Sequence, residues 1–278
     1  MKFAMCNEFC DGWPLEDALK LARDTGYHGV EVAPYTLADD VRDIPMSRRD
    51  ALRSIAEAAG VQIIGLHWLL VKPVGLYVNG PDASLRKKTR DYFSALIDFC
   101  ADLGGDRMVI GSPKSRNVVP ELTYAQAFEY ARETFSSLME LAAERGVTLC
   151  IEPLSPAETN FITTVREGVA LCKAVNHPNF RLHLDVKAMC GEGEGRPLDD
   201  IILDGKGFAA HLHVNDANRN GPGWGDTDYA PIKRGLAAIG YDDYASVEVF
   251  DFSFGAEMIA RKSIELLKTV WPQLTVVF

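Results

Sequence analysis

The stretch that decides the fold is Thr148-Leu-Cys-Ile-Glu152-Pro-Leu-Ser-Pro-Ala-Glu158, in which an apolar run ends in a carboxylate that is followed at once by proline. A short apolar run bounded by a breaker is typical of a buried strand. Because proline cannot continue a central ladder, we expect the strand to end at Glu152. A carboxylate there is costly to desolvate unless it is paired, hydrogen-bonded or bound to a metal. Glu152 is therefore a candidate functional residue.

The same pattern occurs three more times along the chain. The stretches are Arg181-Leu-His-Leu-Asp185, Ala210-His-Leu-His213 and Ala245-Ser-Val-Glu248. Four consecutive strands are thus predicted to end in Glu152, Asp185, His213 and Glu248.

Strand-like runs alternate with helical periodicity eight times. Strands are predicted at Lys2–Asn7, Gly29–Ala33, Gln62–Trp68, Arg107–Gly111, Thr148–Glu152, Arg181–Val186, Ala210–Asn215 and Ser246–Phe250. Helices are predicted at Leu15–Thr25, Ser47–Ala59, Ser84–Leu103, Thr123–Arg145, Thr164–Val175, Ala230–Ile239 and Glu257–Thr269.

Such alternation predicts parallel strands with crossover helices. The 278 residues suit a single-domain (β/α)8 TIM barrel over residues 1–278, since such barrels have about 250 residues. A Rossmann fold is disfavoured because no GxGxxG loop follows a strand. The glycine-rich segment from Val186 to Pro197 is interpreted as a mobile loop, and the apolar tail Thr275–Phe278 is expected to pack on the barrel floor or on a partner.

Composition limits the partners. The 29 basic residues are outnumbered by 39 acidic ones, for a net charge of -10, which argues against nucleic acid and anionic membranes as partners. No run of eighteen apolar residues occurs and the N-terminus has no signal-peptide pattern, so we expect a cytoplasmic protein. The six scattered cysteines predict reduced, mostly buried thiols and no structural zinc site.

In TIM barrels the active site lies at the C-terminal ends of the strands, so the four strand-end residues should converge. Three carboxylates at close range repel one another unless a divalent cation lies among them. Glu152, Asp185, His213 and Glu248 are therefore predicted to bind one metal ion. An oxygen-rich set favours Mn²⁺, with Mg²⁺ and Co²⁺ as alternatives to it.

Strand parity places the remaining histidines. His183 and His211 share faces with Asp185 and His213 but lie one layer lower. We interpret them as hydrogen-bonded core residues or as supports for the metal ligands. His67 ends the third strand and is either in the pocket or a structural histidine.

The chain resembles the xylose isomerase-like barrel superfamily, and within it the ketose 3-epimerases. The motifs are Ile151-Glu-Pro-Leu154 with Glu158, His183-Leu-Asp185, His211-Leu-His213 with Asn218-Arg219, and Val247-Glu-Val-Phe250. The resemblance implies that the four predicted ligands bind the metal, and that Glu158 and Arg219 contact sugar oxygens. It also implies that Glu152 and Glu248 are the acid/base residues, and that the protein is a dimer or tetramer.

The predicted function is a metal-dependent isomerase or epimerase of a sugar, oxidised sugar or polyol. Two carboxylates on opposite faces of a carbon can invert it through an enediolate that a metal stabilises. The alternative is a lyase or dehydratase that eliminates from a keto-sugar, inosose or 3-oxo-glycoside. An apurinic-site endonuclease needs more than the six histidines present, and a non-catalytic accessory subunit would show no metal-dependent turnover.

Two features depart from the epimerase pattern. Ala188 occupies a position where the ketose epimerases have histidine, and Lys187 precedes it. Lys187 and His67 are predicted to contact the substrate and to disfavour plain ketohexoses. The loop Ser112–Asn117 contains Lys114 and Arg116, and is either a solvated loop or a site for a carboxylate or phosphate.

Overall fold

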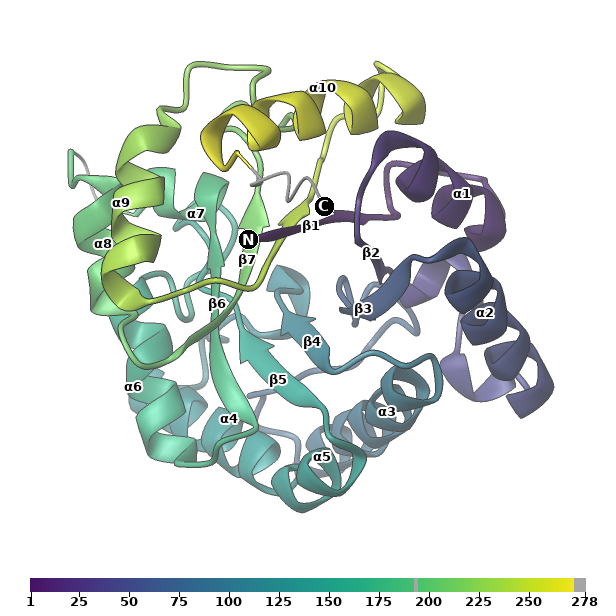
Figure 1. Cartoon of the computed structure of the whole chain (residues 1–278). Coiled ribbons are helices and arrows are strands. Elements are labelled where there is room, and N and C mark those ends of the chain that lie inside the picture. Colours follow the sequence, from purple (N-terminus) through teal and green to yellow (C-terminus); the bar gives the residue numbers. More distant parts are fainter. Residues whose placement is uncertain (193–194, 273–278) are drawn as a thin grey trace.

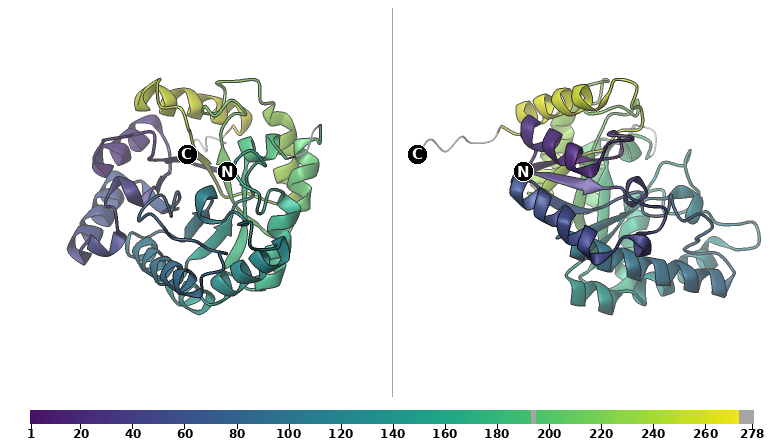
Figure 2. Two further views of the ribbon diagram at one scale, coloured as in Figure 1. Left: turned by 180° about the vertical axis from the view of Figure 1, so that it is seen from behind. Right: turned by 90° about the vertical axis from the view of Figure 1, so that its right-hand side faces the viewer.

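The eight strands close into a parallel barrel in chain order, with β8 paired to β1. The computed structural model describes residues 1–192 and 195–272. Figure 1 shows the strands at the centre and the helices around them, and Figure 2 shows the same arrangement from behind and from the side. The predicted single-domain TIM barrel is confirmed. The predicted packing of the tail Thr275–Phe278 lies outside the described residues.

The strands are β1 (Lys2–Cys6), β2 (Gly29–Val32), β3 (Gln62–Leu66), β4 (Arg107–Ile110), β5 (Thr148–Ile151), β6 (Phe180–Asp185), β7 (Ala209–Val214) and β8 (Tyr244–Val247). The α-helices are α1 (Leu15–Thr25), α2 (Met46–Ala59), α3 (Ala83–Asp102), α4 (Tyr124–Ser136), α5 (Met139–Arg145), α6 (Val165–Val175), α7 (Val186–Cys190), α8 (Leu198–Asp204), α9 (Tyr229–Ile239) and α10 (Ala256–Val270).

The helices form where the sequence puts an apolar stripe against the barrel. In α1, for example, Leu15, Leu19 and Ala22 are buried while the acidic residues of the first turn face the positive end of the helix dipole. The helix ends at Gly26, whose φ of 90° gives the left-handed conformation that a glycine adopts at little cost. The chain then turns directly into β2.

Two predictions about the helices were wrong. The segment predicted as one helix over Thr123–Arg145 is two helices, because the chain bends at Ser137, whose hydroxyl donates to the carbonyl of Thr134 at 2.8 Å. The segment after Asp185 is not all loop, since α7 follows β6 without a gap. Asp185 starts this helix by accepting a hydrogen bond from the backbone N–H of Ala188 at 2.7 Å.

The strand register fixes the heights of the side chains inside the barrel. Asp185 on β6 is paired with His213 on β7, and His183 is paired with His211. Because successive side chains alternate between faces, these two pairs form two adjacent layers of the interior. Asp185 and His213 lie in the upper layer, near the C-terminal ends of the strands.

Candidate metal and sugar site

The four predicted metal ligands lie at the C-terminal end of the barrel. Asp185 is the last residue of β6, and His213 is the second-last residue of β7. Glu152 and Glu248 directly follow β5 and β8. All four side chains are buried, with exposed fractions of 5% or less. One ligand atom from each of Glu152, Asp185 and His213 lies within 4.8 Å of the others, and the Nδ1 atom of His213 is 3.3 Å from Oε2 of Glu248. The structure thus brings the four residues together.

His213 is oriented by a buried carboxylate. Its Nε2 atom is 3.1 Å from Oε2 of Glu31, a fully buried residue on β2. With the proton on Nε2 donated to Glu31, Nδ1 presents its lone pair to the site. Nδ1 of His213 faces Oε2 of Glu248 at 3.3 Å, and neither atom has another hydrogen-bond partner in the described residues. With the ring protonated the two atoms form an ion pair, and with Nδ1 unprotonated they are two facing acceptors, which is the arrangement of ligands that share a cation.

The charges of the cluster are unbalanced. Burial and repulsion by Glu248 and Asp185 raise the pKa of Glu152 well above its ordinary value. Burial and repulsion by Glu248 also raise the pKa of Asp185 to about 6. Burial acts in the same direction on Glu248, but the charge and hydrogen bonding of His213, together with His67, hold its pKa well below the ordinary value. A bound divalent cation would remove the repulsion.

Glu31 was missed in the sequence. Its Oε2 atom is also 2.8 Å from Nε2 of His211 and 3.8 Å from the thiol of Cys6. Burial opposes its ionisation, yet the two histidines hold its pKa well below the ordinary value. The available signal was a carboxylate inside the apolar strand Gly29-Val-Glu31-Val, where only a paired acid is tolerated.

Glu31→Gln is expected to weaken metal binding by about 10- to 100-fold, the usual loss when a carboxylate that orients a ligand histidine is removed. The amide can still accept from His213 but no longer stabilises the ring by charge. Titration with Mn²⁺ under equilibrium dialysis measures the change. Glu57→Gln, the same chemical change at an exposed position of α2, is the control, and equal affinities of the two variants would contradict this role of Glu31.

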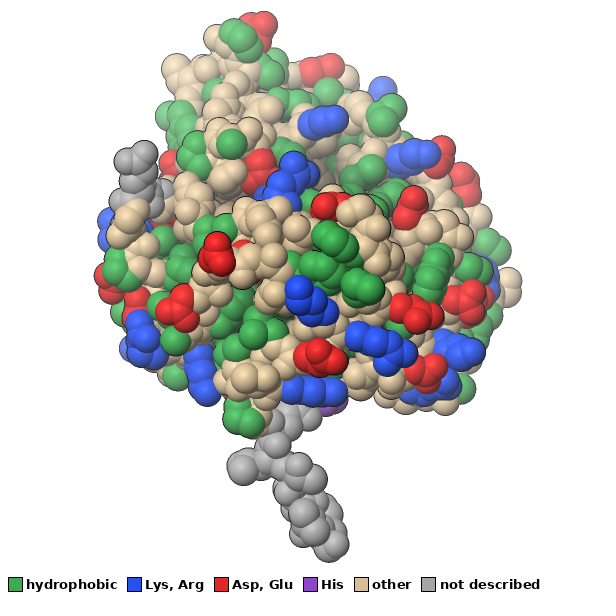
Figure 3. All heavy atoms as spheres, turned by 90° about the horizontal axis from the view of Figure 1, so that it is seen from above, with side chains coloured by type: hydrophobic (Ala, Val, Ile, Leu, Met, Phe, Trp, Pro, Cys, Tyr) green, Lys and Arg blue, Asp and Glu red, His purple; other side chains and the backbone are tan. Residues whose placement is uncertain are grey.

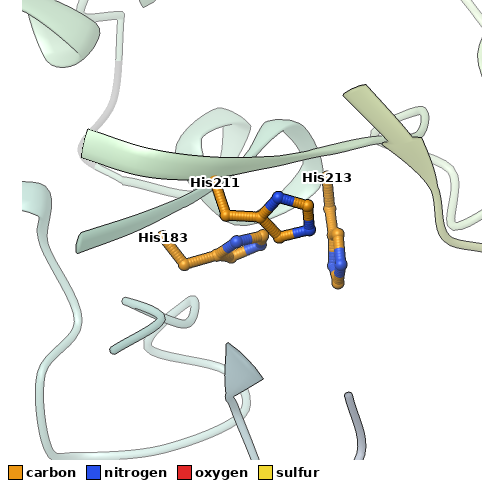
Figure 4. A group of neighbouring side chains, drawn as sticks. All are labelled: His183, His211 and His213. Carbon is orange, nitrogen blue, oxygen red and sulfur yellow. The ribbon is translucent and has the colours of Figure 1, made fainter. Parts of the chain in front are cut away.

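Three histidines from β6 and β7 cluster inside the barrel (Figure 4). The ring centroids of His183 and His213 are 4.2 Å apart, and those of His211 and His213 are 5.3 Å apart. His211 contacts Glu31, the carboxylate that also contacts His213, and its role as a support for the ligands stays a prediction. In the described part of the chain neither ring nitrogen of His183 has a hydrogen-bond partner, so no hydrogen bond to the protein supports its interpretation as a hydrogen-bonded core residue. It lies within ligand distance of Glu152, Asp185 and His213.

His67 lies behind Glu248 and is fully buried. Its Nδ1 atom is 3.6 Å from Oε1 of Glu248, and its Nε2 atom is 3.2 Å from the buried carboxylate of Glu8. Trp68 donates its indole N–H to the same Oε1 atom of Glu248 at 2.7 Å. His67, Glu8 and Trp68 therefore orient Glu248. Contact between His67 and substrate stays a prediction.

Beside the cluster, charged side chains surround the ring of Phe250. The ammonium of Lys187 is 4.4 Å from the ring centroid and the guanidinium of Arg219 is 5.6 Å from it. Lys187 also forms an ion pair with Glu158, with Nζ 2.6 Å from Oε1, and Glu158 accepts from the hydroxyl of Ser155 at 2.8 Å. Lys187 is thus not a surface residue, and it lies next to the two residues predicted to contact sugar oxygens.

Other sequence-based expectations concern the surface and the thiols. Acidic and basic side chains are interspersed on the face seen in Figure 3. None of the helices in the described part of the chain is both long and apolar enough to cross a membrane. All six cysteines are free, and five of them are buried.

Most of the barrel matches one family. A family model described as "Xylose isomerase-like TIM barrel" matches residues 19–270. The chain belongs to this family. The predicted superfamily is confirmed.

Within the xylose isomerase-like TIM barrel family, relatives of this chain are named as epimerases. The ketose 3-epimerase of Arthrobacter globiformis is 24% identical over 196 residues, which cover 70% of this chain and 66% of that protein. A crystal structure of D-psicose 3-epimerase in the presence of D-fructose has a TM-score of 0.85 at 21% identity, over 97% of this chain and 99% of that one. The structure of the IOLI protein with a zinc atom has a TM-score of 0.78 at 18% identity, over 97% and 98%.

Proposed function

We propose that this chain is a divalent-metal-dependent sugar isomerase or epimerase, with Glu152 and Glu248 as its acid/base residues. The observation that carries the proposal is the buried cluster in which Nδ1 of His213 faces Oε2 of Glu248 at 3.3 Å, next to two carboxyl groups whose pKa values are raised. The names of the relatives support the sugar epimerase class. The substrate is a ketose or an oxidised derivative of one.

The donors fit a divalent cation. Glu152, Asp185, His213 and Glu248 would hold it with three carboxylates and one imidazole, a set that suits Mn²⁺, Mg²⁺ or Co²⁺ better than a structural zinc site. We propose Mn²⁺ as the native ion. When bound, it would supply positive charge beside the substrate oxygens that become negative as a proton is removed from the neighbouring carbon.

The protein residues would move the proton. Glu152 and Glu248 follow strands that are separated by β6 and β7 in the closed barrel, so their carboxylates approach a sugar from different sides. One would take the proton from one face of the carbon and the other would return a proton to the opposite face. The environment separates their pKa values in opposite directions, which is the usual sign of an acid and base pair. Trp68 holds Oε1 of Glu248 in place by its hydrogen bond.

The test is incubation with Mn²⁺ and a panel of ketoses, oxidised sugars and inosose in deuterated water, followed by mass spectrometry and NMR. Epimerisation gives a product with the mass of the substrate plus one deuterium at a single carbon. A product that has lost water or an aglycone would replace this proposal by the elimination reaction. If no sugar takes up deuterium and none loses water or an aglycone, with the metal bound, both reactions are rejected.

Lys187→Met is expected to change which sugar is accepted, because it removes the ammonium that holds Glu158 and leaves that carboxylate half-buried without its cation. We expect kcat/KM for the best substrate of the panel to fall by about 10-fold or more, since the loss of a charged hydrogen bond costs roughly 1.5–3 kcal/mol. Steady-state kinetics on fructose, psicose and tagatose against 3-oxo sugars measure this. Fast epimerisation of the free ketohexoses, unaffected by Lys187→Met or His67→Ala, would contradict the substrate contacts of both residues.

A further inference from the structure

Arg116 is a buried guanidinium whose hydrogen bonds are mostly unused. Its exposed fraction is 2%, and one of its nitrogens, Nη1, donates to the carbonyl of Ile110 at 3.2 Å. The Nε and Nη2 atoms have no hydrogen-bond partner among the described residues. In the part of the chain that the structure describes, no carboxylate oxygen lies within 4.0 Å of this guanidinium. Burial without a close counter-charge lowers the pKa of Arg116 to about 10.

Neither of the other two buried arginines, Arg86 and Arg107, leaves as much of its guanidinium unused within the described residues. Arg107 is held between Asp106 at 2.7 Å and Asp243 at 2.9 Å. Arg86 has no ion pair in the described residues, but its Nη1 atom donates to the carbonyls of Gly80 and Pro81 at 2.6 and 3.0 Å, and its guanidinium lies 3.9 Å from the centroid of the Tyr130 ring. Arg116 has neither a carboxylate nor an aromatic ring beside it in the described residues, and a desolvated charge without such a partner is costly, so its free N–H groups suit a partner from outside the chain.

The backbone around Arg116 is fixed in place. The segment Tyr77 to Asn79 binds three successive carbonyls of the loop: Val78 N–H donates to Ser115, the Asn79 amide donates to Arg116, and the Tyr77 hydroxyl donates to Asn117, at 2.8, 2.8 and 2.6 Å. A loop held this firmly presents a preorganised group rather than a solvated one.

The guanidinium lies beside the proposed catalytic site. The carbonyl to which Arg116 donates belongs to Ile110, the last residue of β4. Oε2 of Glu152 lies against the next residue, Gly111, because a Cβ atom built on that glycine would be only 2.2 Å from this oxygen. Of the carboxylates, Glu152 and then Glu158 act most strongly on the charge of Arg116. Neither is free to bind it in the working site, because Glu158 is paired with Lys187 and Glu152 is a proposed metal ligand.

We propose that the Nε and Nη2 edge of Arg116 binds a carboxylate of the substrate, which makes this protein an epimerase or isomerase of keto-sugar acids rather than of neutral ketoses. The inference rests on the proposed function for the site it adjoins. Nε and Nη2 form the planar fork of two parallel N–H groups that matches the two oxygens of a carboxylate. A dianionic phosphate would call for further donors, and the nearby Lys187 already neutralises Glu158.

The experiment uses matched pairs of sugars that differ only in whether the terminal carbon is a hydroxymethyl group or a carboxylate. Binding of D-fructuronate and D-fructose, and of D-tagaturonate and D-tagatose, is measured by calorimetry on the Mn²⁺-loaded full chain, with D-fructose 6-phosphate as the phosphate probe. We expect each uronate to bind about tenfold or more tightly than its ketose, as suits a charge-assisted bidentate contact. In Arg116→Met this ratio should fall to near one, and in Arg116→Lys, which keeps the charge but not the fork, it should fall in part.

Because each ratio is taken within one variant, a change in stability or metal content affects both sugars alike. Lys114→Met, in the same loop but exposed, is the matched control and should keep the wild-type ratio. Equal binding of uronate and ketose by the wild type, a preference that survives Arg116→Met, or a stronger Arg116-dependent preference for the phosphate each overturns the proposal. If the uronate preference depends on Arg116 but no sugar takes up deuterium, the epimerase function fails and the anion site stands.

Discussion

Glu248→Gln and Glu152→Gln are each expected to reduce the rate of deuterium uptake at the reacting carbon by about 10²- to 10⁴-fold, the range that a positioned acid or base contributes. The amide has nearly the same shape as the carboxyl group but cannot carry the proton. The hydrogen bond from Trp68 to Oε1 of Glu248 can be kept by the amide oxygen, so the orientation of the side chain should change little.

Metal content is the necessary control for this prediction, because a neutral amide is also a poorer ligand than a carboxylate. Both variants are assayed at saturating Mn²⁺, with the bound metal measured by atomic absorption. Glu57→Gln on the exposed face of α2 makes the same chemical change away from the barrel mouth. If a metal-loaded variant retains a rate within tenfold of the wild type, the residue it replaces is not an essential acid or base.

The sequence was sufficient to place the strand-end residues because their positions follow from local rules. Pro153 stops a ladder, so Glu152 had to lie at the end of its strand. Parallel strands in one barrel end at the same side, so Asp185, His213 and Glu248 had to join it. The structure brings these four side chains together, and the family match extends over the same strands.

Contacts between distant strands could not be predicted in the same way. Glu31 and Glu8 are ordinary acidic residues in the sequence, and their role depends on which histidine the closed barrel places opposite each of them. Arg116 lies in a polar loop whose composition is typical of a solvated loop. Its burial depends on the hydrogen bonds that Tyr77 and Asn79 donate to carbonyls of this loop. The break between α4 and α5 has no glycine or proline, and it depends on the hydroxyl of Ser137.

Two of the residue groups that could hold a metal ion share His183 and His213 and differ in whether carboxylates or His211 complete them. His183, His211 and His213 form one group whose ring nitrogens lie within 4.8 Å, and Glu152, His183, Asp185 and His213 form another. Our assignment uses His213 with the carboxylates, because its Nδ1 atom faces Glu248. A histidine-rich site would instead use His183 and His211 as ligands, and neither ring nitrogen of His183 has a hydrogen-bond partner in the described residues.

His213→Ala is therefore expected to weaken Mn²⁺ binding by more than about 100-fold, beyond the loss typical of a residue that only supports a ligand. His183→Ala, one layer lower on β6, should retain the metal to within about tenfold for the same reason. Calorimetric titration with Mn²⁺ measures both affinities, and thermal unfolding without metal shows whether each barrel remains folded. If His183→Ala loses the ion as completely as His213→Ala does, His183 is itself a metal ligand, and the proposed set of Glu152, Asp185, His213 and Glu248 is wrong.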